Sequence, residues 1–428
     1  MRKPIGMYVS LLTMILLIHR TGNSQPDVGL KSQPCTLSRF LTSVAKGNLG
    51  YTAEKFNVSI AEAEYNASKV FPDPELSFVY SNNEDHRLQM GQSLETSLSY
   101  PVSFGKKRNT LMSLTRSEYE LSQIVLDAYF QNLRAKAALS YFDALKNYRI
   151  YLLQLDIQNL MDKLAETDSI RFAVGDISEI DAMQSCQDAR IQKSEVRQSL
   201  AYYRNSLVNL QLLQGDVTKD TLIHPADDFP HPERTFLLHD LLEKAKENRM
   251  DLLIAAKNNE ISKKELKLLE AARAFEFNLE SGYSFNSVVK NEIAPAPSFI
   301  GLSFGMAFPL KFSNLNKGTL EAAKTNITRN ETLFREIENQ VCAEVIQAFN
   351  DFNSHKEILS EFEKGLIDDA EKILTGKITS YQRGESGLIE VINARQSYTR
   401  LRLDYIETLN RYTTSLIGLE LMTGFWDL

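Results

Sequence analysis

The chain has 428 residues, with 48 Lys plus Arg against 55 Asp plus Glu and a formal net charge of −7. This balance argues against a nucleic-acid-binding protein, which normally carries a basic excess or a basic face. Hydrophobic residues make up 43% of the sequence, enough for a sizeable core, whereas three cysteines cannot form a disulfide scaffold. The sequence contains no glycine-rich phosphate loop, no Gly-x-Ser-x-Gly and no His-Glu-x-x-His, so nothing in it indicates an enzyme or a cofactor.

Residues 1–24 have the three parts of a secretory signal peptide. Arg2 and Lys3 are basic, residues 7–18 form a mostly apolar run, and residues 22–24 include small side chains suited to cleavage before Gln25. The alternative is an uncleaved anchor. No later stretch reaches about 18 consecutive apolar residues, so we expect no transmembrane helix in the mature chain. A crossing of the membrane would then require strands closed into a barrel.

The sequence repeats itself after about half its length. Three motifs recur in the same order at offsets of 208, 209 and 209 residues: YPVSF at 100–104 as FPLKF at 308–312, Phe172-x-x-Gly175 as Tyr381-x-x-Gly384, and a leucine-rich segment ending at Gly215 as one ending at Gly424. Three matches in one register are stronger evidence for an internal repeat than any single match. We expect two repeats, residues 25–215 and 236–428, joined by a linker over residues 216–235 that contains three prolines and no periodicity.

Each repeat begins with an amphipathic helix followed by two strands. The helices are expected over residues 37–70 and 236–274. Apolar and polar residues then alternate over residues 76–80 and 94–100 in the first repeat, and over 277–285 and 300–308 in the second. This period of two, with one apolar face, is typical of strands.

A very long helix follows the second strand of each repeat. Residues 109–170 contain neither Pro nor Gly, and residues 319–380 contain only Gly365 and Gly376. A helix of 62 residues would be about 93 Å long. Apolar residues recur every seven positions in both, which predicts lengthwise side-by-side packing with a left-handed supercoil. After Gly175 and Gly384 a helix resumes, so we expect two antiparallel helical hairpins.

Four strands with one apolar face cannot close a barrel alone, and their edges would stay open. This predicts an oligomer, and three chains would supply 12 strands. The expected fold class is therefore mainly α with a β-barrel portion: two repeats, each with long coiled-coil-like helices and two strands that contribute to a barrel shared between chains.

The ordered set of features resembles the TolC-type outer membrane efflux proteins. The set comprises the signal peptide, the duplicated layout, the paired aromatic-x-x-Gly turns and the segment FGKKR at residues 104–108. The resemblance implies a homotrimer in the outer membrane lipid, with an α-helical barrel in the periplasm. It also implies a passive exit duct that works with a periplasmic adaptor and an inner-membrane transporter of the RND or ABC type.

The same resemblance assigns roles to residues at the helical turns. The adaptor-docking tips would comprise six residues: Phe172, Gly175, Ser178, Tyr381, Gly384 and Gly387. Acidic residues six positions after each tip glycine, Asp181 and Glu390, would narrow the periplasmic entrance together with Asn393. At Asn393 and Ser386 this chain departs from the family's pattern of an aspartate and an arginine. The side-chain contacts that close the entrance would therefore differ from those of the family.

These assignments have plainer alternatives. Asp181 and Glu390 could be solvated residues in a first helical turn, where acids suit the helix dipole. His224, His231 and His239 lie within 16 residues but without metal-ligand spacing, and we expect no metal site there.

The protein as a whole also admits other functions. It could serve type I protein secretion, or be a periplasmic or secreted helical scaffold without a channel. The sequence leaves the cargo open among drugs, metal ions and proteins, with small-molecule or metal-ion efflux favoured.

Overall fold

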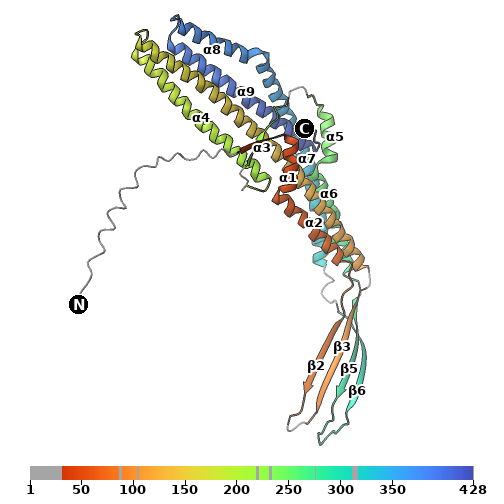
Figure 1. Cartoon of the computed structure of the whole chain (residues 1–428). Helices are drawn as coiled ribbons and strands as arrows, with labels where there is room; N and C mark the ends of the chain where they lie inside the picture. The colour runs from red at the N-terminus through yellow and green to blue at the C-terminus, as the bar shows by residue number, and fades with distance from the viewer. Residues whose placement is uncertain are drawn as a thin grey trace, which may run out of the picture.

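The computed structural model describes residues 31–85, 89–103, 106–217, 221–230, 234–274, 276–310 and 317–427. The molecule is elongated, with a sheet at one end and the turns of two helical hairpins at the other (Figure 1). The expected signal peptide, Phe104, Gly105, His231 and residues 311–316 lie outside the described residues. Within the described ranges, no helix is both long enough and apolar enough to cross a membrane.

The two repeats have the same order of main elements, as expected. The first runs β1 (Lys31–Cys35), α1 (Leu37–Gly47), α2 (Leu49–Ala67), β2 (Glu75–Asn82), β3 (Gln92–Ser103), α3 (Lys107–Ala173) and α4 (Glu179–Leu213). The second follows β4 (Thr221–Pro225) and runs α5 (Leu238–Asn248), α6 (Met250–Ala271), β5 (Glu276–Asn286), β6 (Phe299–Ala307), α7 (Lys317–Glu361), η2 (Phe362–Leu366), α8 (Ile367–Gln382) and α9 (Leu388–Thr423).

The first helix of each repeat is broken, contrary to the expectation of single helices over 37–70 and 236–274. Asn48 has ψ 120°, and its side chain accepts a hydrogen bond from the Tyr51 amide to cap α2. Arg249 has the same backbone conformation between α5 and α6. At each break the end of the repeat's last helix approaches closely, because a Cβ added to Gly215 or Gly424 would lie 2.1 or 2.7 Å from a backbone oxygen.

The linker over residues 216–235 contains a strand that the sequence analysis missed. Strand β4 pairs in parallel with β1 and thereby joins the start of the first repeat to the start of the second. Each strand has five residues and includes a proline, too short for an alternating pattern to be visible. The Asp227 carboxylate then accepts hydrogen bonds from the Leu37 amide and the Tyr141 hydroxyl, so the linker caps α1.

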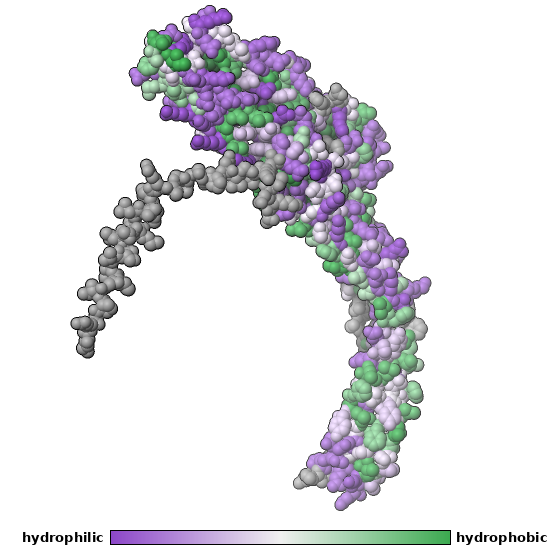
Figure 2. Space-filling view, in the orientation of Figure 1, coloured by the Kyte–Doolittle hydropathy of each residue, from purple (hydrophilic) through white to green (hydrophobic). Residues whose placement is uncertain are grey.

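The predicted strands are confirmed and form one antiparallel sheet in the order β2-β3-β5-β6. Pairing of β3 with β5 places the two repeats side by side, with Tyr100 opposite Leu279. One face of the sheet is apolar and exposed, and its largest contributors are Leu76, Phe78, Tyr80, Leu94, Leu98, Leu279, Tyr283, Phe285, Ile300, Leu302, Phe304 and Met306. Figure 2 shows hydrophobic residues gathered over these strands.

The opposite face of the sheet carries small and polar side chains in register. One row across the strands reads Ser77, Ser97, Gly282 and Ser303, and the neighbouring rows include Glu95 and Glu280. Strands of this composition have one face suited to lipid and one suited to water.

The long helix of the first repeat is continuous, whereas that of the second is interrupted. Helix α3 has 67 residues without a break and runs from the sheet to the far end of the molecule (Figure 1). In the second repeat, Gly365 adopts φ +98° and separates α7 from α8 through the short segment η2. The expectation of one helix over 319–380 was therefore wrong at this position, because only glycine enters the left-handed region at little cost.

The heptad positions form the core where the helices pack. Val345, Phe352 and Leu359 on α7 are fully buried against α5 and α9, as are Ala135 and Phe142 on α3 against α1 and the linker. Beyond Gly365 the same stripe emerges, since Leu366 and Ile373 are about half exposed, at 47% and 58%. The interruption thus marks the point where the stripe leaves the chain's own core.

Candidate functional site

The turns at the far end of the helical hairpins have the same backbone geometry. Gly175 and Gly384 adopt φ +79° and +75°. The amide of the following residue, Asp176 or Glu385, donates to a carbonyl five residues back, at 2.8 and 2.9 Å. This is the Schellman pattern, which places glycine just past the end of a helix. The aromatic-x-x-Gly motif is therefore a helix terminator repeated in both halves.

The helices that follow the two turns start differently. The Ser178 hydroxyl accepts a hydrogen bond from the Asp181 amide at 3.1 Å and donates to the Asp181 carboxylate at 2.8 Å. Gly387, at the equivalent position before α9, has no side chain to do this. The Glu390 carboxylate is instead 2.5 Å from the Lys377 ammonium on α8. The acidic residues thus have local partners in the single chain.

The predicted acidic residues occupy the positions expected from the hairpins. Asp181 lies half-buried in the first turn of α4, and Glu390 lies exposed in the first turn of α9. Asn393 follows three residues later and is exposed as well. The capping contacts of Asp181 and the ion pair of Glu390 agree with the alternative of helix-start residues.

The two aromatic tip residues differ in burial. Phe172 is 45% exposed, whereas Tyr381 is 4% exposed and packs in the cluster formed by α3, α4, α8 and α9. The Tyr381 hydroxyl donates to the Asp168 carboxylate on α3 at 2.9 Å. Only a hydroxyl-bearing ring can make this bond, so the Phe-for-Tyr difference between the repeats has a structural consequence.

Asp168 and Arg171 are tip residues that the sequence analysis missed. Burial raises the pKa of Asp168, against the opposing effect of the Tyr381 hydrogen bond. The Arg171 guanidinium lies 4.9 Å from the centre of the Tyr381 ring, bonds the Tyr381 carbonyl at 3.3 Å and pairs with Asp176 at 2.6 Å. An acid on the apolar stripe of α3, three residues before a basic residue, could have indicated this link between the hairpins.

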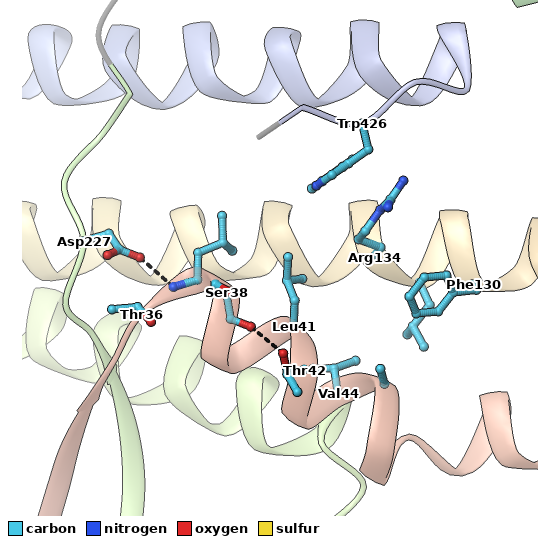
Figure 3. Close-up of a pocket in the computed structure, with 12 residues that line it drawn as sticks. Thr36, Ser38, Leu41, Thr42, Val44, Phe130, Arg134, Asp227 and Trp426 are labelled. Atoms are coloured by element: carbon cyan, nitrogen blue, oxygen red, sulfur yellow. Dashed lines mark hydrogen bonds between the residues drawn. The ribbon is translucent and has the colours of Figure 1, made fainter. Parts of the chain in front are cut away.

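Midway along the molecule, α1, α3, the linker and the C-terminal segment form a pocket of about 570 Å³. Figure 3 shows Asp227 from the linker, Arg134 and Phe130 from α3, and Trp426 from the C-terminal segment around it. The Arg134 guanidinium lies 4.3 Å from the centre of the Trp426 ring. These contacts hold the two repeats together at their midpoint.

The histidines do not assemble in the described structure. The His224 ring in β4 lies 2.6 Å from the Tyr203 hydroxyl, and burial lowers its pKa. His239 is exposed at the start of α5, beside Glu243. Among the described residues, no group of three His, Cys, Asp or Glu side chains is close enough to hold a metal ion.

Part of the chain is similar to a known protein family. Residues 241–425 match the model of the outer membrane efflux protein family. The matched residues lie in the second repeat, from within α5 to the segment after α9. The cobalt-zinc-cadmium resistance protein CzcC of Cupriavidus metallidurans is 21% identical over 437 residues, which cover 98% of each chain.

Solved structures share the fold of this chain along nearly its whole length. CusC superposes with a TM-score of 0.74 at 16% identity, covering 91% of this chain and 92% of CusC. The Campylobacter jejuni CmeC outer membrane channel gives the same TM-score at 13% identity, covering 91% of this chain and 85% of CmeC. The fold implied by the TolC-type resemblance is thus confirmed: the chain shares the fold of outer membrane channels such as CmeC, and its second repeat matches the outer membrane efflux protein model.

Proposed function

We propose that this protein is the exit duct of a tripartite efflux pump. The observation that carries the proposal is the two-faced sheet at one end of the long helical hairpins. In the part of the chain that the structure describes, β2 and β6 are the edge strands, each with one neighbour. Four strands from each of three chains would make a closed set of 12 and leave no edge.

The helical hairpins would extend into the periplasm, with their turns against an adaptor protein. The docking surface would comprise the tip residues Phe172, Gly175, Ser178, Tyr381, Gly384 and Gly387. Exposed apolar side chains beside the first tip, such as Val174 (75%) and Ile180 (76%), support a partner surface there. The adaptor would in turn connect the duct to an inner-membrane transporter of the RND or ABC type.

Asp181, Glu390 and Asn393 would line the periplasmic entrance of the trimer. Three copies of each carboxylate around one axis would favour cations at the mouth. Within each chain, the contacts of Tyr381 with Asp168 and Arg171 would hold the two hairpins together in the closed state. In this network of contacts Arg171, from the first tip, would supply the positive charge that the family pattern places at the position of Ser386.

The proposed cargo is a divalent metal ion. The name of the relative CzcC specifies resistance to cobalt, zinc and cadmium, and that relative matches along the full length of the chain. The acidic residues at the tips and on the polar face of the sheet suit the passage of cations.

Deletion and complementation would test the duct. Cells lacking the gene should accumulate Co²⁺, Zn²⁺ or Cd²⁺ and grow poorly with these ions. The wild-type gene should restore growth, whereas the variant Asp181→Asn/Glu390→Gln should form trimers but give pores with altered cation preference in planar bilayers. Purified protein that formed neither trimers on unheated gels nor pores in bilayers would contradict the proposal.

A further inference from the structure

A cavity of about 1140 Å³ lies where the sheet joins the helices, and we call it the junction cavity. Its walls come from five segments that are distant in sequence. They are the end of α2 with the residues after it (67–73), the end of β3 (100–102), the start of α3 (106–111), the start of β5 (276–278) and the end of β6 (307–309). In Figure 1 this is the narrow neck between the strands and helices α2, α3 and α6.

Three consecutive basic residues at the start of α3, Lys106, Lys107 and Arg108, line the cavity. The Lys107 ammonium is already paired with the Glu276 carboxylate at 2.7 Å. Over the described ranges, Lys106 and Arg108 have no carboxylate within ion-pair distance, although Asp73 also lines the cavity. The Arg108 guanidinium lies 3.8 Å from the centre of the Phe71 ring, and its buried Nε has no hydrogen-bond partner. Among the residues that the structure describes, Lys106 and Arg108 thus line the cavity without a paired carboxylate.

One part of the cavity wall, formed by Tyr100, Phe277 and Phe308, is aromatic and continuous with the exposed apolar face of the sheet. Tyr100 lies opposite Leu279, which in turn lies opposite Met306. Leu279 and Met306 are 48% and 58% exposed. The rings of Phe277 and Phe308, at the cavity end of this face, are 5.8 Å apart. An apolar chain leaving the cavity would therefore pass directly onto the face that suits lipid.

Basic side chains without paired carboxylates, next to an apolar surface, suit the binding of an anionic amphiphile. A guanidinium and an ammonium bind phosphate through charge-assisted hydrogen bonds. Long basic side chains characteristically place their stems on apolar surface and their charge at a membrane interface. A soluble phosphate compound would make no use of the aromatic wall.

We propose that the junction cavity binds the phosphate of an anionic glycerophospholipid through Lys106 and Arg108, with an acyl chain along the apolar face of the sheet. The proposal rests on the proposed function only in placing the sheet in the outer membrane. The bound lipid would cover the neck where strands give way to helices, on the periplasmic side.

Native mass spectrometry of delipidated protein in detergent, titrated with dioleoylphosphatidylglycerol, would test this site. We expect one tightly held lipid per chain, and at least about tenfold weaker binding by the variant Lys106→Gln/Arg108→Gln, since this variant loses two charge-assisted hydrogen bonds to the phosphate. The matched control is Lys193→Gln/Arg197→Gln, which removes two exposed cations from α4. This control should bind like the wild type.

Several outcomes would overturn the lipid site. Equal binding by both variants would do so, as would competition by glycerol 3-phosphate at the same concentration as the lipid. Circular dichroism and unheated gels would establish that each variant folds and assembles. Pore formation measured on the same samples separates this proposal from the duct, because a protein can conduct with or without a lipid in the neck.

Discussion

At the scale of single residues, the two tips show how one atom can give equivalent positions different roles. The turns after Phe172 and Tyr381 share their backbone hydrogen bonds, so the backbone alone does not distinguish them. The hydroxyl of Tyr381 reaches Asp168, which is fully buried, and this bond joins the second hairpin to the first. A buried carboxylate without hydrogen-bond donors is costly. Loss of this bond should therefore cost more free energy than the bond itself contributes.

The variant Tyr381→Phe should therefore lower the free energy of unfolding by about 1–3 kcal/mol. Burial raises the pKa of Asp168, so its carboxyl group binds a proton more tightly in the folded chain than in the unfolded chain. The contribution of Asp168 to stability is then present at low pH and lost as pH rises through its folded pKa. The effect of the variant should be larger at pH 8 than at pH 5, because ionisation of Asp168 increases with pH and an ionised carboxylate loses more when its donor is removed.

Thermal unfolding followed by circular dichroism at both pH values would measure this difference. Tyr398→Phe is the matched control, because Tyr398 is a half-buried tyrosine packed against the same cluster. Equal losses for the two variants, or a loss independent of pH, would contradict the proposed link between the hairpins.

At the scale of elements, the two long helices differ although their heptad patterns are alike. Helix α3 is continuous because its sequence offers no residue that terminates a helix. The chain between α7 and α8 turns at Gly365, which adopts φ +98°. The stripe carried by Leu366 and Ile373 beyond this point is exposed in the single chain. The interruption therefore redirects one helix toward a surface that is free for a neighbour.

Substitution of the two glycines of this region should have opposite effects. Gly365→Ala should destabilise the protein by about 1–2 kcal/mol, because an L side chain is strained at positive φ. Gly376→Ala should stabilise it by about 0.5–1 kcal/mol, because Gly376 lies exposed inside α8 with no atom near an added Cβ. Chemical denaturation of both variants measures these signs. A gain from Gly365→Ala would mean that the interruption is not imposed by this residue.

At the scale of the whole molecule, the sheet of a single chain exposes an apolar face that an assembly in the membrane must cover. Phe304 is 85% exposed on the apolar face, and its neighbour Ser303 faces the other side. Helices α3 and α6, which come from the two repeats that supply the sheet, are joined by an ion pair between Lys257 and Glu120 at 2.6 Å. The sheet is thus presented as one unit with two different faces.

Adjacent substitutions in β6 should then behave differently. Phe304→Lys should reduce trimers in the outer membrane strongly, because a lysine facing lipid costs about 2–4 kcal/mol near the membrane centre. Ser303→Lys should be tolerated, since its side chain would face water. Unheated gels of isolated outer membranes would measure both. Similar amounts of trimer for the two variants would mean that the apolar face does not contact lipid.

The strands, the long helices and the tip turns could all be predicted from the residues alone. Each depends on a local period or a local motif, such as the alternation in residues 300–308 or the helix-terminating glycines Gly175 and Gly384. The family resemblance followed from their order, and the comparison with known proteins agrees with it.

Other features came into view only with the folded chain, because they join residues far apart in sequence. The breaks at Asn48 and Arg249 occur where a distant helix end packs against them, and β1 acquires its partner 190 residues away. The bond between Asp168 and Tyr381 spans 213 residues. A single sequence carries no period that reports such contacts, since their free energy arises from packing and hydrogen bonding between separate elements.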